Sequence, residues 1–339
     1  MSAAKTDVVI IGAGPVGLFS VFECGMLNLS CHVIDVLDFA GGQCAALYPE
    51  KPIYDIPGYP RIDAETLVER LSEQAAPFKP HYLLGERVDD LKRQEDGCWR
   101  VTTSKGNAVS CQAVIVAAGS GAFGPNRPPI GNIEAYEGKS VFYLVRRRDD
   151  FRNKRVVIAG GGDSAVDWAV SLAEVAERVY VVHRRPKFRA APSSVNKLNH
   201  LADQGKLDLV TPFQLHALEG EDGKLERVVA ASLKGEIKKI EADVLLPFFG
   251  LSMNLGPIAD WGLALEKNLV KIDPATSRTD TEGIYAVGDI VTYPGKLKLI
   301  LSGFHEAAMA AHAIRNQIHP DEDLHWEYST TKGLPGQSD

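Results

Sequence analysis

The sequence contains few cysteines, no long apolar run and no excess of positive charge. The five cysteines are odd in number and none belongs to a C-x-x-C pair. This pattern excludes a typical disulfide scaffold and the usual ligand spacing of a zinc site. No segment approaches the roughly 18 consecutive apolar residues that a transmembrane helix needs. A formal net charge of −7 argues against general nucleic-acid binding, so we expect neither nucleic acid nor a membrane as a partner.

What is present is typical of a globular protein with two domains. The chain has 339 residues, of which 45% are hydrophobic and 24% are charged. This length is too great for one small core. The first residues lead directly into an apolar strand and leave no room for a signal peptide. We accordingly expect a cytoplasmic protein.

A glycine-rich turn follows the first apolar run. Its sequence, GAGPVG at residues 12–17, matches G-x-G-x-x-G between a strand and a helix. In such turns Gly12 permits a tight bend, Gly14 allows the backbone to approach a pyrophosphate, and Gly17 allows helix–strand packing. The helix N-terminus would bind the phosphates. The next strand ends in Asp35, about where a ribose-binding carboxylate belongs, so the pattern predicts a dinucleotide site.

The same scheme recurs in the middle of the chain. An apolar strand at residues 155–159 runs into GGGDSA at 160–165, a G-x-G-x-x-A turn, and a helix is predicted over 166–176. The following strand ends in HRRPKFR at 183–189, where the first unit has an acid. Cations there favour the 2′-phosphate of NADP over the free ribose of NAD. The alternative is that they are only a solvent-exposed, charged end of a strand. Two nucleotide-binding units predict two nucleotides, between which electrons or hydride pass.

Three other stretches suit a flat ligand that carries a polyol. The GGQ sequence at 41–43 fits a backbone lying against a flat ligand, although it also fits an ordinary loop. Asp289 follows an apolar strand and suits hydrogen bonding to a polyol such as a ribityl chain. A helix predicted to begin near Ser302 would stabilise negative charge on a reduced flavin near N1. We interpret His305 in this helix as an ordinary capping or packed histidine.

Turn and cap signals predict several further elements. Asp63 is placed to cap a helix whose apolar stripe starts at Leu67. The sequences at 95–97 and 221–223 predict hairpin turns. A continuous run of small apolar residues at 113–119 predicts a parallel strand buried on both faces.

With both motifs placed, the chain resembles the two-dinucleotide-binding flavoproteins of the thioredoxin-reductase type over nearly its whole length. The resemblance rests on GAGPVG, GGQ, GGGDSA, HRRPKFRA at 183–190 and YAVGDI at 285–290, in that order. It implies an α/β fold of two Rossmann-like, three-layer nucleotide-binding domains. An FAD domain with a C-terminal extension would comprise residues 1–118 and 251–339, and an inserted NADPH domain would comprise residues 119–250.

One departure from that family concerns the redox cysteines. Thioredoxin reductases carry a C-x-x-C just before the second glycine-rich strand, and here those positions fall at about Tyr143 and Arg146. Disulfide exchange therefore lacks a nucleophile. Cys44 lies near the position at which glutathione-reductase-like enzymes carry a redox pair of cysteines. It has no second cysteine a few residues further on, and we interpret it as structural. A disulfide reductase is disfavoured.

The sequence is also similar to the thioredoxin-reductase-like ferredoxin–NADP reductases. Those enzymes lack the dithiol, carry a tyrosine after the GGQ loop and have an aromatic or histidine residue in a C-terminal extension. The resemblance implies that Tyr48 stacks on one face of the isoalloxazine of FAD. It also implies that Tyr328, with Trp326 as a competitor, covers the other face, of its own flavin or of the partner's in a homodimer.

The resemblance further implies a flavoprotein reaction without an acid–base residue. NADPH would pass a hydride to N5 of FAD, and electrons would leave singly, through a semiquinone, to ferredoxin or flavodoxin. Such partners are typically acidic, and a docking face would use Arg146, Arg147, Arg148, Arg152 and Lys154, which are equally compatible with solvated surface charge. One alternative is an NADPH-dependent flavin reductase of a quinone or a low-molecular-weight disulfide. Another is a flavin-binding redox sensor without turnover.

These inferences together assign residues to two cofactors. The FAD contacts are Gly12, Gly14, Pro15, Gly17, Asp35, Gly42, Gln43, Tyr48 and Asp289. The NADPH contacts are Gly160, Gly162, Asp163, Ser164, Ala165, His183, Arg184, Arg185 and Arg189. No metal site is expected.

Overall fold

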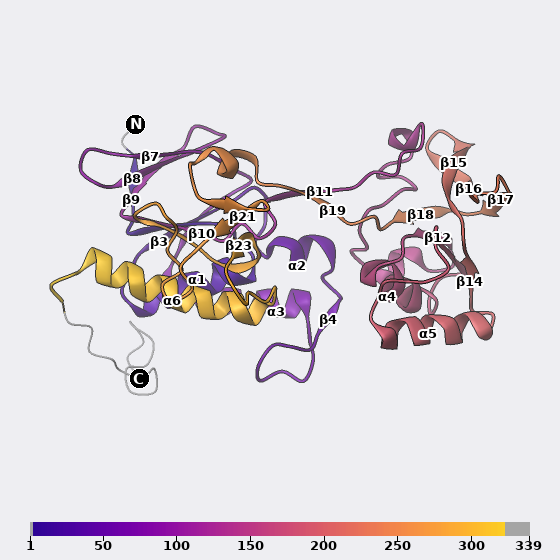
Figure 1. The fold of residues 1–339 in the computed structure, drawn as a ribbon, viewed down its shortest axis with the longest axis horizontal. Helices are drawn as coiled ribbons and strands as arrows, with labels where there is room; N and C mark the ends of the chain where they lie inside the picture. The colour runs from indigo at the N-terminus through magenta and orange to yellow at the C-terminus, as the bar shows by residue number, and fades with distance from the viewer. Residues whose placement is uncertain (1–2, 323–339) are drawn as a thin grey trace. The chain divides into compact units, whose positions relative to one another are not determined.

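A computed structural model describes residues 3–322, and the chain divides into two compact units (Figure 1). The first unit ends at Phe123 and resumes at Met253, and the second comprises Gly124–Ser252. The expected domain boundaries fall slightly earlier, because the chain passes between the units along β11 (Ala122–Pro125) and β19 (Leu251–Asn254). These two strands pair with each other.

The first unit is built on a five-stranded parallel sheet, in the order β22-β10-β2-β3-β6. Its strands are β2 (Val8–Ile11), β3 (Cys31–Asp35), β6 (His81–Leu84), β10 (Ala113–Val116) and β22 (Ile284–Ala286). All residues of β2 and β10 are buried. This burial on both faces explains their unbroken apolar sequence.

The two faces of this sheet are covered by different layers (Figure 1). The helices α1 (Pro15–Met26), α3 (Ala64–Ala75) and α6 (Ile300–Ile318) lie on one side. A second sheet lies on the other, in the order β1 (Ala4–Lys5), β9 (Ala108–Cys111), β8 (Trp99–Thr103) and β7 (Val88–Arg93). Along β2, Val8 and Ile10 pack on the helix side, whereas Val9 and Ile11 pack on the other side, as the two-residue period of a strand requires.

Short elements complete the first unit. They are α2 (Gly42–Leu47), β4 (Pro52–Ile53), β5 (Ile62–Asp63), η1 (Ala76–Phe78), η4 (Gly256–Asp260), β20 (Leu265–Glu266), β21 (Leu269–Lys271), η5 (Gly288–Ile290) and β23 (Val291–Thr292). The apolar stripe of α3 is buried as predicted. Asp63 occupies its N-cap position but makes no cap hydrogen bond; its Oδ1 lies 3.3 Å from Arg61.

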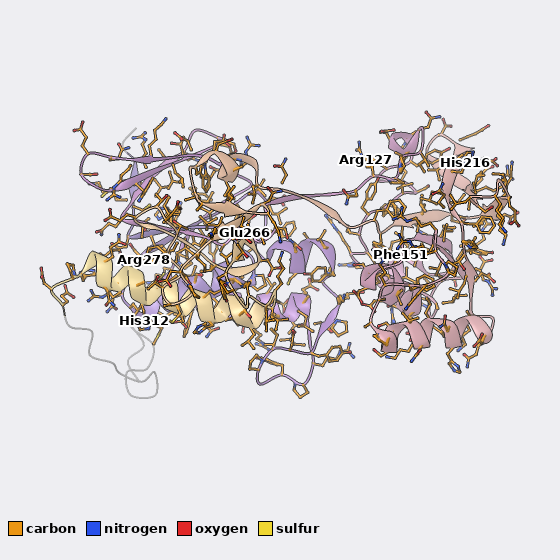
Figure 2. All side chains as sticks on the ribbon, viewed as in Figure 1. Arg127, Phe151, His216, Glu266, Arg278 and His312 are labelled. Carbon is orange, nitrogen blue, oxygen red and sulfur yellow. The ribbon has the colours of Figure 1, made fainter. Side chains whose placement is uncertain are left out.

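The second unit repeats the three-layer scheme (Figure 1). Its parallel sheet has the order β14 (Leu207–Val210), β13 (Arg178–Val182), β12 (Arg155–Ala159) and β18 (Val244–Pro247). The helices α4 (Asp163–Leu172) and α5 (Pro192–Asp203) cover one face, and β15 (Gln214–Glu221), β16 (Lys224–Ala231) and β17 (Ile237–Glu241) cover the other. Phe151, labelled in Figure 2, ends η3 (Arg148–Phe151) and packs into the helix-side core; η2 spans Ile133–Ala135. Two three-layer units confirm the predicted fold class.

The predicted hairpin turns are present in both units. Gly97, between β7 and β8, has a φ of +82°, and Gly223, between β15 and β16, has a φ of +79°. The helix predicted over 166–176 begins earlier, at Asp163, and ends at Leu172. Along residues 3–322, no helix combines the length and the apolar character needed to span a membrane.

Candidate functional site

A cavity of about 280 Å³ lies in the first unit, beyond the carboxyl ends of its parallel strands. Loops that follow parallel strands at this edge are the usual ligand site of such sheets. The structure brings together here most of the residues assigned to FAD from the sequence. They are Gly12, Gly14, Pro15, Asp35, Gly42, Gln43, Tyr48 and Asp289.

The three glycines of the first turn differ in what surrounds them. Gly12 has a φ of +111°, and a Cβ there would lie 2.3 Å from the carbonyl oxygen of Ala117. A Cβ on Gly17 would lie 1.9 Å from the carbonyl oxygen of Gly12. Around Gly14 the nearest atom to such a Cβ is the Cα of Gly42, at 3.9 Å. Packing therefore requires glycine at 12 and 17, whereas the space beside Gly14 is open to the cavity.

Backbone N–H groups at the start of α1 are free to bind an anion. No described residue accepts a hydrogen bond from the N–H of Gly14, Val16 or Gly17, and no side chain caps the helix. Free N–H groups and the positive end of the helix dipole together favour a phosphate. Opposite them lies Gly42, where a Cβ would come within 3.0 Å of the Cα of Gly14. The turn and the GGQ loop thus border a narrow part of the cavity, whose free N–H groups are able to bind an anion.

Asp35, at the end of β3, holds this turn in place. Its Oδ2 accepts the N–H of Ala13 at 2.6 Å, and its Oδ1 accepts the N–H of Leu37 at 2.9 Å. Burial raises the pKa of the carboxyl, while these backbone hydrogen bonds lower it. A carboxylate has about four lone-pair sites, so both oxygens retain acceptor capacity for ribose hydroxyls.

The helix α2 carries an aromatic and a thiol to the cavity wall. Tyr48 follows α2 and is half-buried. Burial raises the pKa of its phenol, and the nearby Cys44 and Asp289 raise it further. Burial also raises the pKa of the Cys44 thiol to about 11. At neutral pH both groups are protonated, and a protonated thiol is not a nucleophile, which agrees with a structural role for Cys44.

The last third of the chain closes the cavity. Asp289 lies in η5, and the wall continues through Leu299 and Ile300. The helix α6 begins at Ile300 rather than near Ser302, with Leu299 in the N-cap position. His305 is exposed on this helix.

A second glycine turn follows β12 in the second unit. A Cβ on Gly160 would lie 2.6 Å from the carbonyl oxygen of Phe248 and 2.9 Å from the Cβ of Ala165. Gly162 has no neighbour within 4 Å of such a Cβ. Asp163 accepts the N–H of Ala191 at 2.9 Å, which fastens one end of the basic segment to the start of α4.

The basic segment contains one side chain that differs from the rest. His183 stacks on Phe188 with ring centroids 5.3 Å apart, and a Cβ on Gly161 would lie 2.2 Å from its Cε1. Burial lowers its pKa, and neighbouring arginines lower it further, so the ring is neutral at pH 7. Arg184, Arg185 and Arg189 are exposed instead. Sequence alone groups His183 with these cations, whereas its partly buried ring packs against Phe188 and Gly161; its contact with NADPH stays a prediction.

No disulfide bond joins the cysteines of the described residues. All five cysteines lie among the described residues and are free. At the positions of the missing C-x-x-C, Tyr143 donates its hydroxyl to Glu137 at 2.7 Å and Arg146 is exposed. Among residues 3–322 no group of three histidine, cysteine or carboxylate side chains is arranged to hold a metal ion.

Some cavity residues carry no sequence signal. Glu86, Arg87 and Val88 follow β6, and Ile258 and Trp261 lie in and just after η4. None belongs to a recognisable motif, because these segments reach the cavity only through the tertiary fold. Trp326 and Tyr328 lie outside the described residues.

Comparisons with known proteins agree with this architecture. The family model "Pyridine nucleotide-disulphide oxidoreductase" matches residues 6–314, and the chain belongs to this family. The thioredoxin reductase of T. acidophilum superposes with a TM-score of 0.78, covering 93% of this chain and 99% of that chain at 24% identity. The Lactococcus lactis thioredoxin reductase gives the same TM-score and identity, covering 93% of this chain and 100% of that one. These two likenesses show the fold.

Closer relatives define the branch of the family. The chain is 63% identical to the ferredoxin–NADP reductase of Paramagnetospirillum magneticum over 335 residues, which cover 99% of both chains. It is 60% identical to that of Rhodospirillum rubrum, over 98% of this chain and 97% of the relative. The Wolbachia pipientis wMel protein of the same name is 56% identical over 98% of both chains. Within the larger family, this chain belongs to the ferredoxin–NADP reductases.

Proposed function

We propose that this chain passes electrons between NADPH and ferredoxin through a bound FAD, without a redox-active disulfide. One observation carries the proposal. The first unit holds a cavity with an open glycine turn, the second holds a glycine turn followed by exposed arginines, and all five cysteines are free. FAD bound in the cavity supplies a hydride acceptor that also releases single electrons.

The residues of the first unit fit the successive parts of FAD. The free N–H groups of Gly14, Val16 and Gly17 bind the pyrophosphate. Asp35 accepts hydrogen bonds from the ribose hydroxyls, and Asp289 accepts them from the ribityl chain. Tyr48 places its ring against one face of the isoalloxazine. All of these residues line the cavity except Gly17, which belongs to the same glycine turn.

The residues of the second unit fit NADPH. The turn from Gly160 to Ala165 binds the pyrophosphate at the start of α4. Arg184, Arg185 and Arg189 bind the 2′-phosphate, because guanidinium groups match phosphate oxygens in charge and geometry. All three are exposed. The ring of His183 packs against Gly161 and thereby supports the turn.

An acidic partner, ferredoxin or flavodoxin, docks on basic side chains of the second unit. Among the candidates, Arg148 pairs with Glu174 at 2.8 Å and Arg152 pairs with Asp149 at 2.6 Å. These pairs leave Arg147, with its neighbour Arg146 and with Lys154, as the stronger part of the docking face. From the sequence we further propose a homodimer in which Tyr328 covers the second face of a flavin. A Tyr328→Ala variant with an unchanged flavin spectrum and unchanged turnover would contradict that part.

The test is anaerobic, NADPH-driven reduction of cytochrome c by the purified protein, with and without added ferredoxin. We expect a strong dependence on ferredoxin that weakens as salt is added, because the docking is electrostatic. If the flavin is reduced but ferredoxin adds nothing, the proposal fails. The acceptor is then a quinone or a low-molecular-weight disulfide.

A further inference from the structure

A buried ion pair lies behind the part of the cavity wall formed by the last third of the chain. Glu306 of α6 pairs with Lys296, and their side chains are 1% and 5% exposed. Charged side chains this deeply buried are rare unless they are paired. Lys296 belongs to the segment at residues 288–299, here called the loop, which contains η5 and β23 and leads to the start of α6. The pair therefore joins this loop to the helix that follows it.

The Glu306 carboxylate holds the loop at two places. Its Oε2 accepts the N–H of Gly288 at 2.7 Å, at the start of the loop. Its Oε1 accepts the hydroxyl of Tyr293 at 2.7 Å and the ammonium of Lys296, in the middle of the loop. The backbone oxygen of Glu306 in turn accepts the hydroxyl of Ser277 at 3.0 Å. One carboxylate thus holds this segment at Gly288, Tyr293 and Lys296, in addition to the pairing of β23 with β21.

The two ends of this loop form part of the cavity wall. Gly288 and Asp289 lie at one end, and Leu299 and Ile300 lie at the other. The start of α6 also packs tightly on the first glycine turn, since a Cβ on Gly303 would lie 2.4 Å from a methyl carbon of Val16. A displacement of the loop is therefore transmitted to both ends of the wall.

We propose that Glu306 and Lys296 are positioning residues for FAD. They fix Asp289 and the N-terminus of α6 against the cofactor, and they keep the charge behind it balanced. This inference rests on the proposed function only in taking FAD as the ligand of the cavity. The physical reason is that removing one partner of a buried pair leaves an uncompensated charge, which moves its segment toward water.

The test compares Glu306→Gln, Lys296→Met and the double variant as apoproteins. FAD affinity is measured by quenching of flavin fluorescence, without NADPH or ferredoxin, so a failure of the proposed electron transfer does not affect the result. We expect Glu306→Gln to weaken FAD binding by about tenfold or more, because glutamine leaves the Lys296 ammonium unpaired. The double variant, which has no unpaired charge, should regain part of this affinity.

The midpoint potential of the bound flavin provides a second readout that a purely structural role would not move. Relative to the unchanged protein, we expect Lys296→Met to lower it, because the negative charge of Glu306 then lies behind the cavity wall without its cation. Glu306→Gln should raise it for the opposite reason.

A control carboxylate lies at the opposite edge of the same sheet. Asp7 accepts the N–H and the hydroxyl of Ser30 at 2.8 and 2.6 Å, at the amino ends of the strands. We expect Asp7→Asn to lower the thermal stability of the apoprotein without changing FAD affinity or potential. The inference is overturned if Glu306→Gln and Lys296→Met leave both quantities unchanged, or if they shift them no more than Asp7→Asn does.

Discussion

Two neighbouring glycines allow the stability of the fold to be separated from the binding of FAD. Gly14 has a φ of −70° and a ψ of 179°, a conformation that alanine adopts without strain. Its Cβ would meet no atom closer than 3.9 Å. We therefore expect Gly14→Ala to leave the apoprotein as stable as before or more stable by about 0.4–1 kcal/mol.

Gly17→Ala should have the opposite effect on stability. Its Cβ would lie 1.9 Å from the carbonyl oxygen of Gly12, so α1 must move away from the turn. Overpacking of this kind costs about 1–3 kcal/mol of unfolding free energy.

The effect of Gly14→Ala on FAD affinity should not follow its effect on stability. A methyl group on Gly14 occupies the open side of the turn, where we place the pyrophosphate. Losing two charge-assisted hydrogen bonds of about 1.5–3 kcal/mol each would weaken FAD binding by about 10²- to 10⁴-fold.

The assay is urea denaturation of both apoproteins together with titration by FAD. Gly14→Ala should unfold like the unchanged protein and bind FAD poorly. If Gly14→Ala binds FAD as tightly as the unchanged protein, the pyrophosphate does not lie against Gly14, and the assignment of the cavity is refuted.

Three further predictions concern the second unit. Arg185→Ala should raise the KM for NADPH by about tenfold or more, from the loss of a charge-assisted contact to phosphate, while the KM for NADH stays constant in steady-state assays. The carboxylate of Asp243 accepts hydrogen bonds from Arg155, and these lower the pKa of Asp243 below its ordinary value of 3.8. The stability that this charged carboxylate adds to the folded state is complete above pH 3.8, and it is lost as the pH falls through the lower pKa of the folded state. Asp243→Asn should therefore lower the unfolding free energy at pH 7, with a difference from the unchanged protein that shrinks below about pH 3.8. Arg147→Glu should slow ferredoxin-dependent reduction of cytochrome c more at low than at high salt, and equal slowing at both would contradict the docking face.

The local elements were predictable from the sequence because their signals are local. The strand before the first glycine turn shows its burial as an unbroken apolar run, and the contact that requires glycine at 17 is with the carbonyl oxygen of Gly12 in the same turn. The hairpin at Gly97 has the same local character. These features require no knowledge of distant segments.

The parts that escaped prediction depend on distant contacts. Glu306 reaches Gly288 across 18 positions of sequence, and although Gly288 lies in the YAVGDI motif, Glu306 belongs to none of the motifs used above. Trp261 reaches the cavity from a segment without periodicity. The pKa of His183 is lowered first by burial, to which the tertiary fold contributes, and then by the neighbouring arginines, whereas the sequence shows only a cluster of cations.

The first unit is built from two stretches of the chain that are separated in sequence by the second unit, and this arrangement affects how the protein folds during synthesis. Its parallel sheet takes β22 from beyond the second unit, and this strand pairs with β10. During synthesis the second unit, which is continuous, can fold while the edge of β10 still lacks its neighbour. The cavity needs Gly288 and Ile300, so cofactor uptake must follow release of nearly the whole chain from the ribosome. A translation product that stops after the second unit would expose an unpaired strand edge, prone to aggregation, and would have no flavin site.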